Sequence, residues 1–184
     1  MQFHRRFFPF LVVCILFICS GCAARNPDWA TPVSVPGLPN LYQVSPMLYR
    51  SAQPSIEGFE QAARMGITTV INLHGGESKA VASQGMTSIS IPSTSRTIGD
   101  AEIVTALRVI RDAKGPVLVH CAHGAHRTGI VVAAYRVVFQ NWTPQKASSE
   151  MTSAWYGFRS SGRERLILYM RHLNPEKLKA QVFE

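Results

Sequence analysis

The apolar and polar positions of this chain form short β-branched runs and longer segments with helical periodicity. Runs of strand length lie at residues 41–44, 48–51, 67–73, 86–91 and 117–120. Ser45-Pro46 separates the first two runs and predicts a hairpin. Because the later strands alternate with helices, the pattern predicts one α/β domain with a central, mainly parallel sheet flanked by helices.

Capping residues mark the starts of several predicted helices. Ser55 is suited to cap a helix that runs through Met65, and Thr143-Pro144 is suited to begin one that reaches Ala154. Further helices are predicted at residues 79–83, 100–110, 130–139 and 163–172. The segment 130–139 is apolar on nearly all sides, so we expect a mostly buried helix there.

Residues 1–22 have the pattern of a secretory signal. Arg5 and Arg6 precede an apolar run at residues 7–18, and Ser20-Gly21-Cys22 follows it. That run is too short for a spanning helix, so a removable signal is predicted, with a retained membrane anchor as the alternative.

Ser20-Gly21-Cys22 resembles the lipobox of bacterial lipoproteins, in which the cysteine becomes the lipidated first residue. The resemblance implies an exported protein anchored through Cys22. With Ala23 next, it implies the outer membrane and a periplasmic location in a Gram-negative cell. Cys19 stands where that pattern usually has leucine, so ordinary cleavage near Ala23 or Ala24 stays open.

Four prolines lie between residues 23 and 39, where hydrophobic periodicity is weak. Such a composition predicts an extended linker between the anchor and the domain. The domain is therefore expected at residues 40–184, a length that supports one sizeable core.

The composition narrows the range of functions. A formal net charge of +8 favours anionic ligands, but the chain has no basic stripe interleaved with aromatic residues, so we expect no nucleic-acid partner. Two of the four cysteines fall inside the signal, and lipidation would occupy Cys22. Cys121 would then be a lone thiol in an oxidising compartment, which favours a chemical role over a packing role.

Cys121 ends the strand at 117–120, and Arg127 follows it after five loop residues. In a strand–loop–helix unit of this length the loop amides can point inward at the positive end of the helix, which makes an anion site. The same field favours a thiolate, and the planar guanidinium fits a phosphoryl group. The residues expected to bind the substrate phosphate are Ala122, His123, Gly124, Ala125, His126 and Arg127.

His120-Cys121, five residues and then Arg127-Thr128 resemble the signature of cysteine-dependent protein tyrosine phosphatases, in their dual-specificity branch. The segments 40–54 and 69–73 look like the amino-terminal part of small bacterial phosphatases of this type. The loop sequence from Gly124 to Gly129 is also similar to plant and fungal atypical dual-specificity phosphatases, some of which act on inositol pyrophosphates. The resemblance covers roughly residues 40–155 and implies the cysteine-phosphatase fold.

The resemblance implies hydrolysis of phosphotyrosine, and of phosphoserine or phosphothreonine if the cleft is shallow, through a cysteinyl-phosphate intermediate. Cys121 would be the nucleophile, Arg127 would hold the phosphoryl oxygens, and Thr128 would hydrogen-bond the thiolate. His120 would orient the loop. No metal or organic cofactor is implied, and four ligand types crowded into residues 120–126 lack the spacing of a zinc site.

The general acid is the least defined part of the predicted site. The family usually supplies an aspartate from the loop before the helix that precedes the active strand, and Asp100 is the only carboxylate in residues 93–100. Asp100 is equally suited to be a helix N-cap. Arg96, in the same loop, is expected to contact additional phosphates of a polyanionic substrate or to lie in solvent. The same two roles are open to three arginines later in the chain, Arg159, Arg163 and Arg165. His74 is expected to form a pocket wall or an exposed loop.

Three alternatives to a protein phosphatase follow from these observations. The first is a phosphatase for an inositol phosphate or pyrophosphate. The phosphoanhydride of an inositol pyrophosphate has a leaving group good enough to need no acid. A weakly catalytic phosphate-binding module would lack the acid altogether. Sulfur-transfer and arsenate-reducing enzymes also use a cysteine in an anion loop, but the Arg127-Thr128 pair and His120 disfavour them. The expected partner is a phosphorylated protein or a polyphosphorylated small molecule.

Overall fold

The computed structural model describes residues 25–76 and 78–184, so the predicted signal at 1–22 and Cys22 lie outside the described residues. The strands are β1 Thr31–Pro32, β2 Tyr42–Ser45, β3 Leu48–Ser51, β4 Thr69–Asn72, β5 Thr87–Ser90 and β6 Val117–His120. The helices are α1 Ile56–Arg64, α2 Ser78–Ala82, α3 Asp100–Asp112, α4 Arg127–Gln140, α5 Pro144–Met151, α6 Glu164–His172 and α7 Pro175–Phe183, with a 3₁₀ turn at Ala154–Tyr156.

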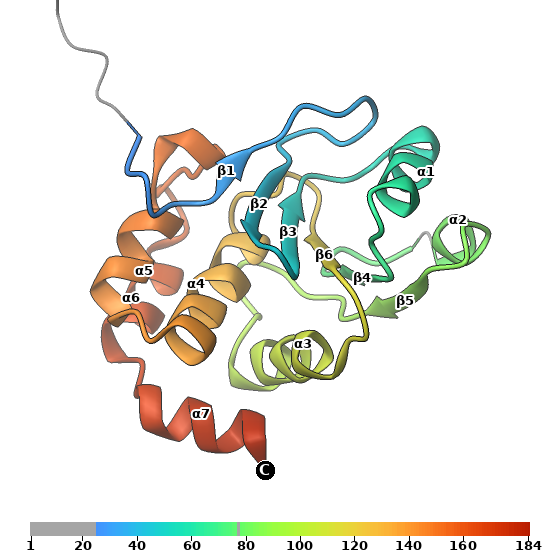
Figure 1. Cartoon of the computed structure of the whole chain (residues 1–184). Coiled ribbons are helices and arrows are strands. Elements are labelled where there is room, and N and C mark those ends of the chain that lie inside the picture. The colour runs from blue at the N-terminus through green and yellow to red at the C-terminus, as the bar shows by residue number, and fades with distance from the viewer. Residues whose placement is uncertain (1–24, 77) are drawn as a thin grey trace, which may run out of the picture.

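The strands form one sheet in the order β1-β2-β3-β6-β4-β5 (Figure 1). Strand β6 is parallel to both of its neighbours, β3 and β4, and β4 is parallel to β5. Only the β1-β2-β3 edge is antiparallel. The predicted α/β class with a mainly parallel sheet is confirmed, and the carboxyl ends of the central strands meet at one edge, where such sheets bind ligands.

Strand β6 contributes to a separate core on each face of the sheet because side chains alternate along a strand. Val117 and Val119 pack in the larger core, with residues of α3 to α7. Leu118 faces the other way and packs with residues of α1, among them Phe59. The strand is therefore buried on both faces, which explains its unbroken apolar sequence.

Helix α4 follows directly from the loop after β6 and is buried from Thr128 to Val138. The helix has no polar face for solvent, because its surface is apolar on nearly all sides. Neighbouring elements therefore surround it, and α5 packs along much of its length. This burial fixes the position of the first turn of α4, and with it the end of the loop that begins at Cys121.

The predicted linker at 23–39 is wrong for its described part, because residues 25–39 pack on the domain. Strand β1 pairs with β2, and the side chains of Ala30 and Leu38 are buried. The backbone N–H of Ala30 donates to Glu150 Oε1 at 2.7 Å. Prolines limit regular structure but do not prevent packing, so composition alone misassigned this segment.

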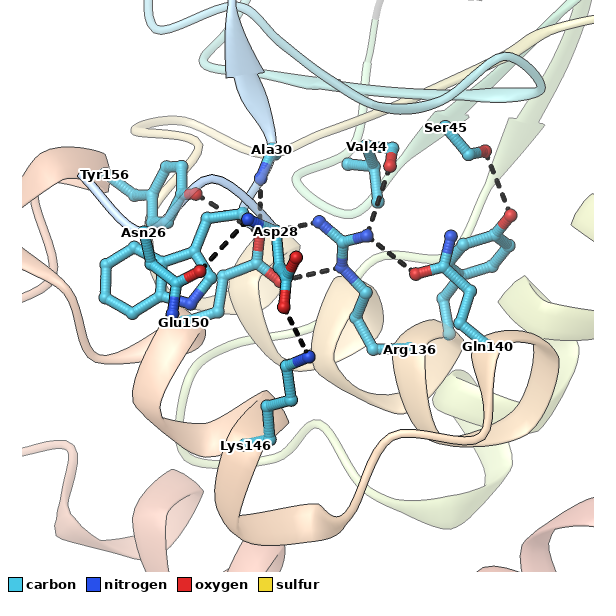
Figure 2. Close-up of polar contacts among 12 residues, drawn as sticks. Asn26, Asp28, Ala30, Val44, Ser45, Arg136, Gln140, Lys146, Glu150 and Tyr156 are labelled. Carbon is cyan, nitrogen blue, oxygen red and sulfur yellow. Dashed lines mark hydrogen bonds and ion pairs between the residues drawn. The ribbon is translucent and has the colours of Figure 1, made fainter.

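The partner of Ala30 belongs to a buried ion pair that joins α4 and α5 (Figure 2). Arg136 donates from Nε to Glu150 Oε2 at 2.7 Å and from Nη2 to Oε1 at 2.8 Å. The Tyr156 hydroxyl donates to the same Oε1 at 3.2 Å. One carboxylate therefore holds the amino-terminal segment, two helices and the 3₁₀ turn together.

Two further predictions about elements need correction. Asp100 is not an N-cap: Gly99 precedes the first turn of α3, and its N–H donates to Glu102 Oε2 at 2.9 Å. Helix α7 was not predicted, although Asn174 caps it and Pro175 stands at its first position. Among the described residues, no helix is long and apolar enough to cross a membrane.

Candidate active site

Cys121 lies on the floor of a cavity of about 400 Å³ at the carboxyl edge of the sheet. The wall residues come from the ends of β4 and β5, the loop after β6 and the segment before α6. They are His74, Ser93, Thr94, Ser95, His123, His126, Arg127 and Arg163. No carboxylate is among these described lining residues, so the cavity presents only neutral and basic groups to a ligand.

The Cys121 thiol is 2 % exposed, and its pKa lies below the ordinary value of 9.0. Burial raises this pKa, but hydrogen bonds from the side chain and the backbone of Thr128 and from the backbone of His123 outweigh it. The charge of Arg127 acts in the same direction. The loop that surrounds the sulfur therefore favours the nucleophilic thiolate form.

The loop from 121 to 127 can close around an anion because Gly124 has φ +67° and no side chain. A Cβ at Gly124 would lie 2.5 Å from the carbonyl carbon and oxygen of Ser51, so only glycine fits against β3. The close contact between Gly124 and Ser51 holds the backbone of the loop against β3.

Arg50 supports the same loop from below. Its side chain is fully buried, and Nη2 donates to the Gly124 carbonyl oxygen at 2.6 Å. The guanidinium also stacks on the ring of Tyr156, 4.2 Å from the centroid. Since Tyr156 bonds to Glu150, contacts run without a break from the amino-terminal segment to the loop at residues 121–127.

Arg127 is oriented by two carbonyl groups at the ends of neighbouring strands. Its Nη1 donates to the oxygens of Leu73 and Ser93, both at 2.7 Å. Its Nη2 lies 3.3 Å from His74 Nδ1, which accepts because a guanidinium has no free acceptor. These contacts hold the guanidinium in the cavity wall beside the thiol.

The histidines of the loop have different surroundings. Burial, assisted by neighbouring charges, lowers the pKa of His120 to about 4, and its ring packs edge-on against Phe59. Burial and Arg163 lower the pKa of His126 to about 4, and its Nε2 accepts from the backbone N–H of Arg159 at 3.3 Å. His123 is exposed at the cavity mouth. His120 and His126 are thus neutral at neutral pH and shape the site without adding charge.

The structure brings the predicted loop residues, Cys121, Arg127 and Thr128 together, but not Asp100 or Arg96. Asp100 Oδ1 accepts from the Tyr169 hydroxyl at 2.9 Å, and the carboxylate borders a separate hollow between α6 and α7. Arg96 is exposed on a turn closed by Thr94 and Thr97, and it does not line the cavity.

Several site residues were missed or undervalued from the sequence. His74 is part of the cavity wall and is also exposed, so the structure agrees with both readings of this residue. Ser93, Thr94, Ser95 and Arg163 also line the cavity. The position of His74 directly after β4 was a usable signal, because side chains after neighbouring parallel strands meet at one edge. Arg163 was expected either to contact additional phosphates or to lie on a solvated basic face, and the structure places it in the wall.

Comparison with known proteins gives one consistent result. A family model described as "Tyrosine phosphatase family" matches residues 38–168. The chain is 36% identical over 152 residues to the dual specificity protein phosphatase TpbA of Pseudomonas aeruginosa, covering 81% of this chain and 69% of that protein. It is 30% identical over 115 residues to the inositol diphosphatase DSP5 of Arabidopsis thaliana, covering 56% of each.

A solved structure of Pseudomonas aeruginosa TpbA extends the likeness to three dimensions. A cysteine-to-serine variant in complex with pTyr superposes with a TM-score of 0.78 at 32% identity. The match covers 88% of this chain and 99% of that chain. The likeness therefore extends over most of this chain and nearly all of that one.

Proposed function

Because this chain belongs to the tyrosine phosphatase family and is homologous to dual-specificity phosphatases, we propose that it hydrolyses phosphotyrosine through Cys121. The observation that carries the proposal is the thiol with lowered pKa on the floor of an anion-binding loop, beside the fixed guanidinium of Arg127. The relative TpbA, whose variant binds pTyr, supports the same substrate class.

In the first step the Cys121 thiolate attacks phosphorus, and the bond between phosphorus and the leaving oxygen breaks. The leaving oxygen takes up a proton and departs as the alcohol or phenol. The loop amides and Arg127 hold the three equatorial oxygens while their charge redistributes. Thr128, which lowers the thiol pKa, stabilises the thiolate before the attack.

In the second step a water molecule attacks the phosphorus of the cysteinyl-phosphate. The sulfur–phosphorus bond breaks, inorganic phosphate leaves, and the sulfur returns to the thiolate form. The hydrogen bonds from Thr128 and the loop amides that lower the thiol pKa also stabilise this leaving thiolate.

The source of the leaving-group proton decides between two substrate classes. With no carboxylate among the described residues that line the cavity, the site favours a leaving group of low pKa. An aryl oxygen meets that condition better than an alkyl oxygen, and a phosphoanhydride meets it best. Hydrolysis of a phosphoanhydride is therefore the second candidate function, and the likeness to DSP5 supports it.

Rates on a series of aryl phosphates whose leaving phenols differ in pKa test this proposal, with Cys121→Ser as the blank. We expect turnover that the substitution abolishes, and a kcat/KM that falls steeply as the phenol pKa rises, because no acid compensates for a poor leaving group. A flat dependence would reveal a proton donor and contradict the argument from the lining. Phosphate binding without any turnover would favour a binding module instead.

We propose separately that the protein is exported and anchored through a lipid on Cys22. The apolar run at 7–18 and the Ser20-Gly21-Cys22 sequence support this proposal. Expression of the whole chain with labelled palmitate in a Gram-negative host tests it. We expect label in the outer-membrane fraction that Cys22→Ser removes, whereas unlabelled, soluble periplasmic protein from the unsubstituted chain would contradict the anchor.

A further inference from the structure

A second hollow of about 690 Å³ opens beside the cavity that holds Cys121. The two hollows share His123, His126 and Arg163 as lining residues. Asn40, the turn at 154–157 and Arg159 complete the second one. A group bound there would lie next to a phosphoryl group above Cys121, close enough to belong to the same substrate.

Two arginines give this hollow a positive charge that the protein does not neutralise. The Arg159 guanidinium makes no hydrogen bond or ion pair with any residue in the described part of the chain. Arg163 donates from Nη1 to the Ser161 carbonyl oxygen and has no carboxylate partner there. No acidic residue is among the described lining residues. An anionic group therefore complements the site.

The wall also offers an apolar surface, because the Trp155 side chain is 54% exposed at the edge of the hollow. This wall is held in place: Tyr42 donates from its hydroxyl to the Trp155 carbonyl oxygen at 2.7 Å. Asn40 Nδ2 donates to the carbonyl oxygens of Tyr156 and His123, which ties the turn to the phosphate-binding loop.

An indole face beside two guanidinium groups suits a side chain with an aliphatic stem and an anionic head. A compact polyphosphate would use the cations but leave the indole without a partner. Building on the proposed phosphatase function, we propose that the second hollow is a specificity subsite for an acidic side chain next to the phosphotyrosine of a peptide substrate.

Binding of paired phosphotyrosine peptides to the Cys121→Ser protein tests this proposal independently of turnover. The peptides of a pair differ only by glutamate or glutamine at one position, and each position flanking phosphotyrosine is scanned. At a position on one side of phosphotyrosine, we expect the glutamate peptide to bind about three- to tenfold more tightly than the glutamine peptide. This difference in affinity is what one charge-assisted contact at a half-exposed site contributes.

When Arg159→Ala is added, the ratio of the affinities for the glutamate and glutamine peptides should fall close to one. Arg171→Ala is the matched control, because it removes the same charge from an exposed position of α6 that does not line either hollow, and the ratio should persist. Equal affinities for both peptides at every flanking position would overturn the proposal. An inositol polyphosphate serves as a second probe. If Arg159→Ala weakened binding of this probe but not of the peptides, that result would also overturn the proposal. Aryl phosphate turnover by the unsubstituted protein reports separately on the phosphatase function.

Discussion

At the scale of single residues, the reactivity of this site depends on the pKa of one thiol. Burial raises that pKa, and the neighbouring groups lower it. A thiol that is 2 % exposed would ordinarily stay protonated, yet the pKa of Cys121 is lowered. The hydroxyl and the backbone of Thr128 are the first contributors in that direction. Without the Thr128 hydroxyl, the effect of burial on the Cys121 pKa should therefore be compensated less.

Thr128→Val should raise the pKa of the Cys121 thiol. The folded pKa lies below 9.0, so the thiolate is present above that lowered pKa and is lost as the pH falls through it. Alkylation by iodoacetamide across pH measures the midpoint, and we expect it to shift to higher pH because one hydrogen bond to the charged form is lost. An unchanged midpoint would show that the amides and Arg127 alone set it.

Gly124→Ala should damage the phosphate-binding loop. The added Cβ would lie 2.5 Å from Ser51 carbonyl atoms at a residue with φ +67°, so the loop must move. Displacement of the reacting groups by about 1 Å costs on the order of a hundredfold in turnover. Steady-state rates on an aryl phosphate measure the loss.

Gly66→Ala is the matched control for this substitution. Gly66 has a similar φ of +81°, but nothing lies within 4 Å of the position that a Cβ would take there. It should lose about 1 kcal/mol of stability and keep its turnover. Similar activity losses in both variants would contradict the role assigned to close packing at Gly124.

At the scale of elements, the Arg136–Glu150 pair decides how the helices and the amino-terminal segment fit together. Figure 2 shows the Glu150 carboxylate between Arg136, Ala30 and Tyr156, whereas Lys146 and Asp28 pair at the surface. Both partners of the inner pair are at least 96% buried, with side-chain exposures of 4% and 1%.

Glu150→Gln should destabilise the fold strongly, because it leaves the Arg136 charge buried without a counter-ion. The expected loss in the free energy of unfolding is about 3–5 kcal/mol, measured by urea denaturation. Lys146→Ala breaks the exposed pair with Asp28 and should change stability far less. Equal losses in the two variants would contradict the importance given to burial.

At the scale of the whole molecule, local sequence signals predicted the architecture well, and long-range contacts explain the rest. Periodicity and capping residues identified most elements because neighbouring residues determine both. The packing of residues 25–39 includes the hydrogen bond from Ala30 to Glu150, which lies 120 positions away, so composition could not reveal it. Helix α7 is a different case, because its local signals, the Asn174 cap and Pro175 at the first position, were present in the sequence.

In the active site, too, local sequence predicted some residues correctly, and long-range contacts decided the positions of others. Cys121, Arg127 and Thr128 come together because one strand, one loop and one helix start are contiguous in the chain. Asp100 and Arg96 were assigned by their place in a loop, but the turn at Thr94–Thr97 and the contact with Tyr169 direct them elsewhere. Arg163 enters the wall from a segment whose path depends on the packing of α6.

Direct detection of the cysteinyl-phosphate tests the central claim of this account. An aryl phosphate is mixed with the protein, the reaction is quenched in acid within the first turnovers, and peptides are examined by mass spectrometry. We expect a phosphoryl group on the peptide that contains Cys121, and none in the Cys121→Ser protein. Turnover without any phosphoryl adduct, or an adduct that persists in the variant, would contradict catalysis through this cysteine.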